Sequence, residues 1–167
     1  MEIYYGQQPD GPYKQSNSAE DIVMRISEPI YESGRNITTD NWFTILKLVK
    51  ALEKKKISCV GTARKNKREL PLSFALPKRT VQYDGIFGYA RNETLVSYVP
   101  NKGKTVVLLS SLYTSNNAVA DNRERKPEII EHYNSIKSGV DVVDKLLYYV
   151  QRCQSNKVMA DGHRIIY

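Results

Sequence analysis

One short segment, Ile57–Thr62, does most to constrain what this chain can fold into, because it is almost wholly apolar. A run of this kind is typical of a strand inside a sheet that helices cover. The stretch at 37–42 begins with β-branched residues and predicts a second strand, and residues 43–56 place apolar side chains at helical spacing between the two. Strand, helix and strand in that order favour a parallel pair with a right-handed crossover. The sequence therefore predicts an α/β fold.

Other elements are signalled by residues at their ends. Ser18 is expected to cap the helix that follows it, with Asp21 supplying the carboxylate of a capping box. Pro127 is expected to begin a later helix, at the position where a missing backbone N–H costs little. The remaining predicted elements are three strands and one last helix, at Glu2–Gly6, Thr94–Val99, Thr105–Ser110 and 140–152.

Positive charge is concentrated in one part of the chain. Residues 45–80 hold 11 basic and 2 acidic side chains, which exceeds the net charge of +7 for all 167 residues. Such a segment favours a polyanion as partner, because each Lys or Arg that meets a phosphate releases counterions. A solubilising, lysine-rich surface would have the same composition, so the charge alone leaves both interpretations open.

Several classes of protein are excluded. The chain has no run of 18 apolar residues, so a transmembrane helix is not expected. The N-terminus lacks the basic and apolar regions of a secretory signal. Two cysteines are too few for a disulfide scaffold or a four-cysteine zinc site, and they favour a reducing compartment. We expect neither a membrane nor a small-molecule substrate as partner.

Three carboxylates stand out by their positions. Asp40 ends a predicted strand, and Asp141 and Asp144 lie three residues apart on one face of an otherwise apolar helix. Carboxylates without a histidine or cysteine cluster suit Mg²⁺ or Mn²⁺ rather than zinc. Two such ions, about 3.5–4 Å apart, can activate a water or a hydroxyl for attack on a phosphodiester. Spacing alone leaves a simpler alternative open, since Asp40 could cap the helix after it.

Six short motifs occur in order along the chain: Thr39–Thr44, Val60–Pro71, Ser97–Pro100, Lys126–Ile130, Tyr133–Asn134 and Gly139–Asp144. Together they resemble the piggyBac family of DDE/DDD transposases. The resemblance implies an RNase H-like mixed sheet with flanking helices and a β-rich insertion at about 72–115. These parts would form a catalytic domain at 1–153, followed by a divergent tail at 154–167.

The resemblance also implies roles for individual residues. Asp40 matches the family's second metal-binding aspartate, Asp141 the third, and Asp144 an additional one. Four basic residues would lie beside bound DNA: Arg64, Lys65, Lys67 and Arg68. The family cuts DNA at TTAA targets with Mg²⁺, for which Mn²⁺ is the alternative ion. The resemblance therefore implies that the chain binds DNA, forms a homodimer and is located in the nucleus.

Departures from the family pattern narrow this expectation. No aspartate precedes Tyr4–Gly6, where the family has its first metal ligand, and the sequence after Cys153 diverges. We therefore expect a core that is truncated at both ends, binds Mg²⁺ or Mn²⁺ weakly or not at all, and is catalytically inactive as this chain. The alternative is a non-catalytic DNA-binding or protein-interaction remnant that uses the basic 45–80 surface. A small RNA-binding protein is less favoured, since no RNP-like strand is present.

Four further side chains can be interpreted individually. Trp42 and Phe43 could stack on a nucleobase, but packing in the core is the expected role of both. His132 is expected at the surface. Cys59 lies in the apolar strand and is expected to be an inert core thiol.

Overall fold

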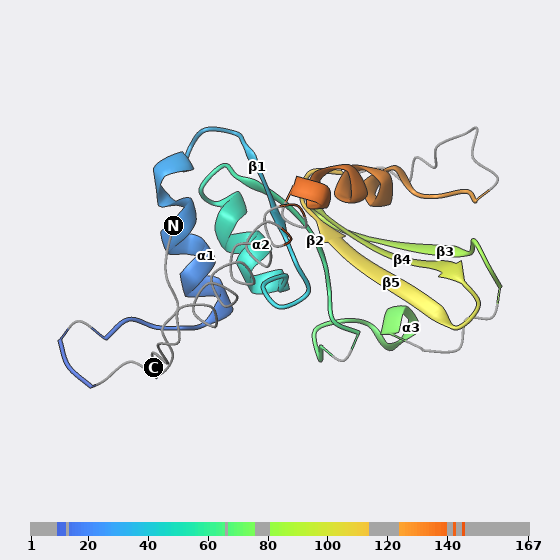
Figure 1. Cartoon of the computed structure of the whole chain (residues 1–167), viewed down its shortest axis with the longest axis horizontal. Coiled ribbons are helices and arrows are strands. Elements are labelled where there is room, and N and C mark those ends of the chain that lie inside the picture. The colour runs from blue at the N-terminus through green and yellow to red at the C-terminus, as the bar shows by residue number, and fades with distance from the viewer. Residues whose placement is uncertain are drawn as a thin grey trace, which may run out of the picture. The chain divides into compact units, whose positions relative to one another are not determined.

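The computed structural model describes residues 10–12, 14–65, 67–75, 81–113 and 124–139, with the single positions 142 and 145. Its elements follow the chain in the order shown in Figure 1: α1 (Ala19–Ser27), a 3-10 turn η1 (Glu28–Ile30), β1 (Asn36–Thr39), α2 (Leu46–Glu53), β2 (Ser58–Thr62), α3 (Leu72–Ala75), β3 (Gly85–Ala90), β4 (Glu93–Asn101) and β5 (Lys104–Ser110). A further helix covers residues 128–139.

The chain divides into two units, Met1–Tyr133 and Asn134–Tyr167. All five strands belong to the first unit and form one sheet in the order β1-β2-β5-β4-β3. β1 and β2 run parallel, with Ile37 opposite Cys59, and every other neighbouring pair is antiparallel. The predicted parallel pair is therefore confirmed. β3, β4 and β5 lie within 72–115, the stretch predicted to be a β-rich insertion, and they continue the same sheet as β1 and β2.

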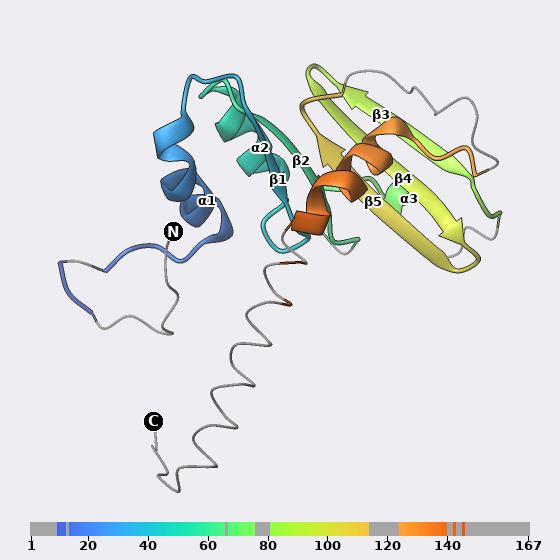
Figure 2. The same ribbon diagram turned by 45° about the horizontal axis from the view of Figure 1, so that its top comes forward.

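Alternate residues of the central strands face two separate cores. Cys59 of β2 and Leu109 of β5 pack with Leu48, Val49 and other apolar residues of α1 and α2. Figure 2 shows α1 and α2 beside β1 and β2, in agreement with this packing. The neighbouring strand residues turn to the opposite face, because successive side chains in a strand alternate.

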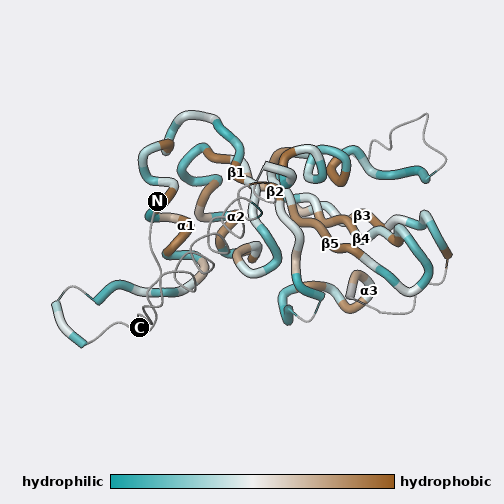
Figure 3. The backbone as a smooth tube through the Cα atoms, viewed as in Figure 1, coloured by the Kyte–Doolittle hydropathy of each residue, from teal (hydrophilic) through white to brown (hydrophobic). Residues whose placement is uncertain are grey.

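The second core lies on that opposite face. Val60 and Leu108 pack there with Ile129 and Ile130, which belong to the helix that follows Pro127. Figure 3 shows the resulting pattern along β4 and β5, where hydrophobic strand interiors are flanked by hydrophilic turns. The sheet is thus covered on both faces in the first unit, as the apolar character of Ile57–Thr62 predicts.

The ends of three elements can be compared with those predicted from the sequence. Ser18 caps α1, where its Oγ accepts a hydrogen bond from the backbone N–H of Asp21 at 3.1 Å. α2 begins at Leu46 rather than Phe43, because residues 41–43 form a turn. β4 and β5 form the predicted hairpin, with Gly103 at a positive φ of 75° in its turn.

Two predicted elements, the strand at Glu2–Gly6 and the helix at 140–152, lie outside the described residues, except for positions 142 and 145, which are helical. The helix after Pro127 is confirmed over residues 128–139. No helix among the described ranges is long and apolar enough to cross a membrane.

Candidate nucleic-acid interface at the carboxyl ends of β1 and β2

Asp40 follows the last residue of β1 and organises the turn after it. Its Oδ1 accepts hydrogen bonds from the backbone N–H groups of Trp42, at 3.1 Å, and Phe43, at 3.3 Å. Aspartate commonly closes a turn in this way, by bonding backbone groups two or three residues ahead. Asp40 is therefore a turn cap and not the cap of α2, since the residue at that cap is Ile45. Both bonds use Oδ1, which leaves Oδ2 of this exposed side chain for a cation.

A buried pair of threonines holds this turn against the sheet. The hydroxyl oxygens of Thr39 and Thr44 lie 2.8 Å apart, and the Thr44 hydroxyl donates to the backbone carbonyl of Asp40 at 2.6 Å. Gly61 in β2 makes room for both, because a Cβ at Gly61 would lie 2.2 Å from Thr44 Oγ1. The register of β1 and β2 pairs Thr39 with Gly61, so the small residue stands where the hydroxyls need space.

The segment after β2 reaches the same turn. Arg64 donates a hydrogen bond from Nε to Oδ1 of Asn41 at 3.3 Å. Its guanidinium carbon lies 4.5 Å from the centroid of the Trp42 ring, in the geometry of a cation–π contact. Parallel strands bring their carboxyl ends to one edge of a sheet, which is why residues 23 positions apart meet here.

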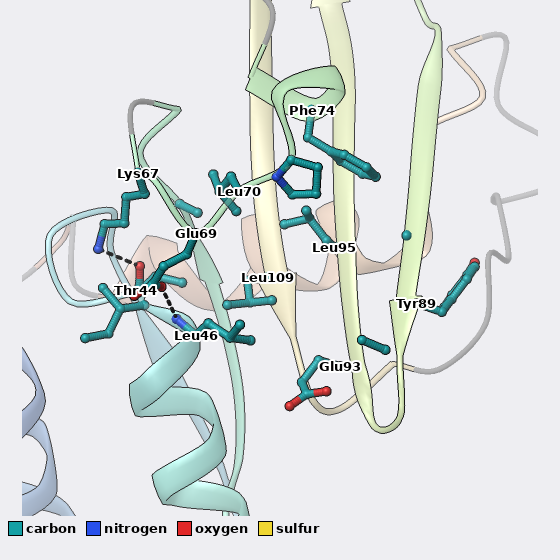
Figure 4. A pocket seen from close by; sticks show the side chains of 15 residues that line it. Thr44, Leu46, Lys67, Glu69, Leu70, Phe74, Tyr89, Glu93, Leu95 and Leu109 are labelled. Atoms are coloured by element: carbon teal, nitrogen blue, oxygen red, sulfur yellow. Dashed lines mark hydrogen bonds between the residues drawn. The ribbon is translucent and has the colours of Figure 1, made fainter.

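Two further contacts join this segment to the beginning of α2 (Figure 4). Lys67 donates from Nζ to the backbone carbonyl of Thr44 at 3.0 Å, and Glu69 Oε2 accepts from the backbone N–H of Leu46 at 3.3 Å. Burial lowers the pKa of the Lys67 ammonium, and the positive charge of Arg64 acts in the same direction, whereas Glu69 opposes them. By accepting from the Leu46 N–H, Glu69 satisfies a backbone donor in the first turn of α2, which has no side-chain cap.

A cavity of about 230 Å³ opens beside these contacts. Its lining is largely apolar and includes Leu70 and Phe74 from the segment around α3 and Leu95 and Leu109 from the sheet. Figure 4 shows Lys67 and Glu69 at the side of this cavity nearer to α2. The basic segment therefore borders an apolar surface on one side and the Asp40 turn on the other.

Two groups of neighbouring basic side chains can be distinguished in the described part of the 45–80 segment. The β2 cluster comprises Arg64, Lys65, Lys67 and Arg68, and it follows the carboxyl end of β2. The α2 cluster comprises Lys54–Lys56 and lies at the other end of α2, where the Lys56 carbonyl accepts from the Gly34 N–H before β1 begins. In the α2 cluster, Lys56 pairs with Glu32 at 2.7 Å. Only the β2 cluster lies beside Asp40.

The predicted metal ligands can be followed only in part. Asp40 is described, whereas Asp141 and Asp144 lie outside the described residues, so their expected convergence with Asp40 stays a prediction. Within the described ranges, no three His, Cys, Asp or Glu side chains form a group that could hold a metal ion. One exposed carboxylate fits a hard divalent cation as a single ligand, and such an ion needs further oxygen ligands.

Individual side chains both confirm and correct the sequence-based expectations. Cys59 is a buried thiol, as predicted, and its burial raises the pKa to about 11. Phe43 packs against the first core. The predicted core packing of Trp42 is wrong, because its side chain is 57% exposed. The predicted surface position of His132 is also wrong, because the residue is half-buried with its ring against Tyr113. Sequence reasoning did not single out Thr39, Thr44 or Glu69, which carry no chemical signature until the turn places them.

Comparison with known proteins gives this site its context. A DDE transposase family model described as Transposase IS4 matches residues 1–162. The chain belongs to this transposase family. It is also similar to a solved piggyBac transposase, a synaptic complex with hairpin DNA determined by cryo-EM, with 38% sequence identity and a TM-score of 0.69. The match covers 81% of this chain and 29% of that one, so this member of the transposase family spans less than a third of the matched protein.

The family membership confirms the resemblance to piggyBac transposases and the fold expected from it. The described part of this transposase chain is a mixed five-stranded sheet with flanking helices, which is the architecture that it shares with the solved relative. The relative is bound to DNA, and the β2 cluster is the basic surface that lies beside the Asp40 turn in this chain.

Proposed function

We propose that this chain is the part of a piggyBac-type transposase that holds DNA at the carboxyl ends of β1 and β2. The observation that carries the proposal is the contact of Arg64 with the turn at Asp40, through Asn41 and the Trp42 ring. It places positive charge directly beside an exposed carboxylate. Phosphate groups bind to the positive charge, and a divalent cation on the scissile phosphate needs the carboxylate as a ligand.

The position of the β2 cluster beside the Asp40 turn favours it over the α2 cluster as the phosphate site, and individual side chains support this choice. Arg68 is exposed and makes no ion pair or side-chain hydrogen bond within the part of the chain that the structure describes. Lys56 of the α2 cluster is already paired with Glu32. A lysine or arginine that is free to meet a phosphate gives more binding free energy than one that must first leave a carboxylate.

The metal is the second part of the proposal. Asp40 offers one carboxylate oxygen, and we propose that Asp141 and Asp144 add theirs to hold Mg²⁺ or Mn²⁺. In the family, a bound divalent ion would supply activation of water or a hydroxyl for cleavage and strand transfer at TTAA targets. We propose that this chain by itself holds the ion weakly and does not cleave DNA, because Asp40, Asp141 and Asp144 match only part of the family's ligand set. The chain's own contribution is the Asp40 turn, which the two threonines hold in place. A homodimer and a nuclear location belong to the same proposal.

DNA binding can be tested by fluorescence anisotropy with a labelled duplex that contains TTAA, measured across a series of salt concentrations. Arg68→Ala and Lys65→Ala should each weaken binding and reduce the salt slope by about 1, because each removes one phosphate contact. Lys102→Ala is the matched control, since Lys102 is an exposed lysine in the turn between β4 and β5. Equal effects of all three substitutions would contradict an interface at the β2 cluster.

The target sequence needs a separate comparison. A duplex of the same length and composition with TTAA scrambled should bind more weakly than the TTAA duplex. Equal affinity for both duplexes would leave phosphate binding in place and contradict recognition of TTAA by this part of the chain.

A further inference from the structure

We propose that Trp42 is a stacking platform for an unpaired nucleobase and that Arg64 covers it until nucleic acid binds. The inference rests on the proposed function and adds to it the kind of DNA that this surface recognises. Its starting point is that an indole ring expected in the core is 57% exposed, directly beside a cluster of basic side chains.

The backbone that carries the Trp42 ring is fixed by hydrogen bonds. The Trp42 N–H bonds to Asp40 Oδ1, and the next N–H bonds to the same oxygen. Thr44 joins this turn to the sheet, because its hydroxyl donates to the Asp40 carbonyl. A tryptophan side chain has only two rotatable bonds, so with its backbone fixed it loses little conformational entropy when a flat partner stacks on the ring.

Arg64 is placed to exchange partners. Its guanidinium lies over the Trp42 ring at 4.5 Å, and its Nε makes one hydrogen bond of 3.3 Å to Asn41. An exposed cation–π contact and one long hydrogen bond are weak interactions, so they hold Arg64 only loosely over the ring. A phosphate would offer Arg64 charged, bidentate hydrogen bonds instead. Movement of Arg64 to a phosphate would uncover the ring face for the adjacent base.

Space for the base is present beside the ring. A hollow of about 320 Å³ is lined by Asn17, Ser18, Ala19, Trp42, Ile45, Arg64 and Lys67. It combines one aromatic face, two cations and the small polar residues before α1. An aromatic face next to positive charge matches a base joined to a phosphate, and this combination is how proteins hold single strands. A paired base is stacked on both faces by its neighbours, so an unpaired base is the one that fits.

The experiment uses the intrinsic fluorescence of the full chain, in which Trp42 is the single tryptophan. The probes are a single-stranded 12-mer, the matching duplex and an abasic 12-mer that keeps every phosphate. We expect the single strand to quench the emission, and the abasic strand and the duplex to bind with little quenching. Quenching of equal size by all three probes would overturn the proposal, because phosphates alone would then cause it.

Affinity gives the second readout. Trp42→Leu should weaken single-strand binding by about tenfold, within the usual range for loss of one stacked base, and weaken duplex binding much less. Trp42→Phe should restore part of the loss. The matched control is Tyr89→Leu, which removes an exposed aromatic side chain from β3 and should change neither affinity.

The outcomes separate this inference from the proposed function. Trp42→Leu binding both single strand and duplex as the parent does would overturn the platform alone. An equal loss for both probes would also overturn it, because it would show no preference for an unpaired base. Absence of binding to either probe by the parent chain would overturn the DNA interface itself. Thermal melts of all variants check that they are folded, which the exposure of Trp42 leads us to expect.

Discussion

Gly61 of β2 lies so close to Thr39 of β1 that a Cβ on the glycine would stand 2.4 Å from the threonine hydroxyl oxygen. The same Cβ would lie 2.6 Å from the Thr39 backbone carbonyl, which cannot rotate away. Gly61→Ala should therefore force the two parallel strands apart and lower the free energy of unfolding by about 1–3 kcal/mol or more. Urea denaturation measures this loss.

The matched control for that substitution is Gly11→Ala. Gly11 has no neighbouring atom within 4 Å of an added Cβ, and its φ is not in the positive region. Its replacement should leave the free energy of unfolding within about 0.5 kcal/mol of the parent value. Similar losses for Gly61→Ala and Gly11→Ala would show that the space between β1 and β2 is not what the glycine provides.

Thr44 gives a second prediction, on the hydrogen bonds that hold the Asp40 turn. Thr44→Val keeps the shape but removes the hydroxyl, which leaves the buried Thr39 hydroxyl and the Asp40 carbonyl without this partner. The expected cost is about 1–3 kcal/mol in the free energy of unfolding, because buried polar groups lose hydrogen bonds. Thr44→Ser keeps the hydroxyl and should cost less. A larger loss for Ser than for Val would mean that the methyl group, not the hydroxyl, matters.

Asp40 gives a third prediction, in which its structural and metal-binding roles separate. Asp40→Asn keeps an oxygen that can accept from Trp42 and Phe43, whereas Asp40→Ala removes it. The alanine variant should lower the melting temperature by about 2–4 °C without metal, and the asparagine variant should not. Both should lose any rise in melting temperature that Mn²⁺ gives the parent chain.

The result of the Mn²⁺ titration also distinguishes the two functions considered from the sequence. A transposase core that holds metal predicts stabilisation that depends on the Asp40 carboxylate. A non-catalytic DNA-binding remnant predicts DNA affinity that depends on salt but not on divalent ions. A rise in melting temperature that survives Asp40→Asn would place the ion elsewhere on the chain.

Cys59 gives a fourth prediction, on alkaline pH. Burial raises its pKa from the ordinary 9.0 to about 11, with the Thr39 hydroxyl opposing the shift. The unfolded chain would ionise this thiol near pH 9, whereas the folded chain keeps it protonated until about pH 11. Its contribution to stability is therefore complete below pH 9 and is lost between about pH 9 and 11, by about 3 kcal/mol at most, since each pKa unit is worth about 1.4 kcal/mol.

The comparison with Cys59→Ala isolates that contribution. Other groups titrate in both proteins, so the difference between their free energies of unfolding at each pH reports on Cys59. This difference should be constant below pH 9 and should shrink above it. Parallel curves from pH 7 to 11 would show that the thiol ionises with the same pKa in the folded and unfolded chains.

Much of the fold could be predicted because its signals are local. The cap at Ser18 and the apolar run at Ile57–Thr62 each depend on neighbouring residues, and both are confirmed. The second half of the predicted capping box differs, because the Ser18 backbone N–H donates to Ser16 Oγ and not to the Asp21 carboxylate. β3 could not be predicted in the same way. Its sequence holds two glycines, and its strand state comes from pairing with β4 at the edge of the sheet. The late start of α2 follows from the turn that Asp40 closes, which competes with a helix.

The candidate site was predictable in its residue types and less so in its arrangement. The position of Asp40 after a strand could be inferred from the pattern, and so could the basic segment after β2. The exposure of Trp42 could not, because hydrophobicity favours burial and only the direction of the turn decides otherwise. Whether Asp141 and Asp144 meet Asp40 stays a prediction of the family resemblance.

The placement of the two basic clusters at opposite ends of α2 has a consequence for how the chain responds to ionic strength. Eight helical residues span about 12 Å, which is longer than the screening length of about 8 Å at physiological salt. Under those conditions, the attraction between a phosphate at the β2 cluster and the α2 cluster is largely screened. In about 0.01 M salt, the screening length reaches about 30 Å, and both clusters attract the same polyanion. Binding at low salt would therefore report on the whole basic segment, and binding at physiological salt on the end that carries Asp40.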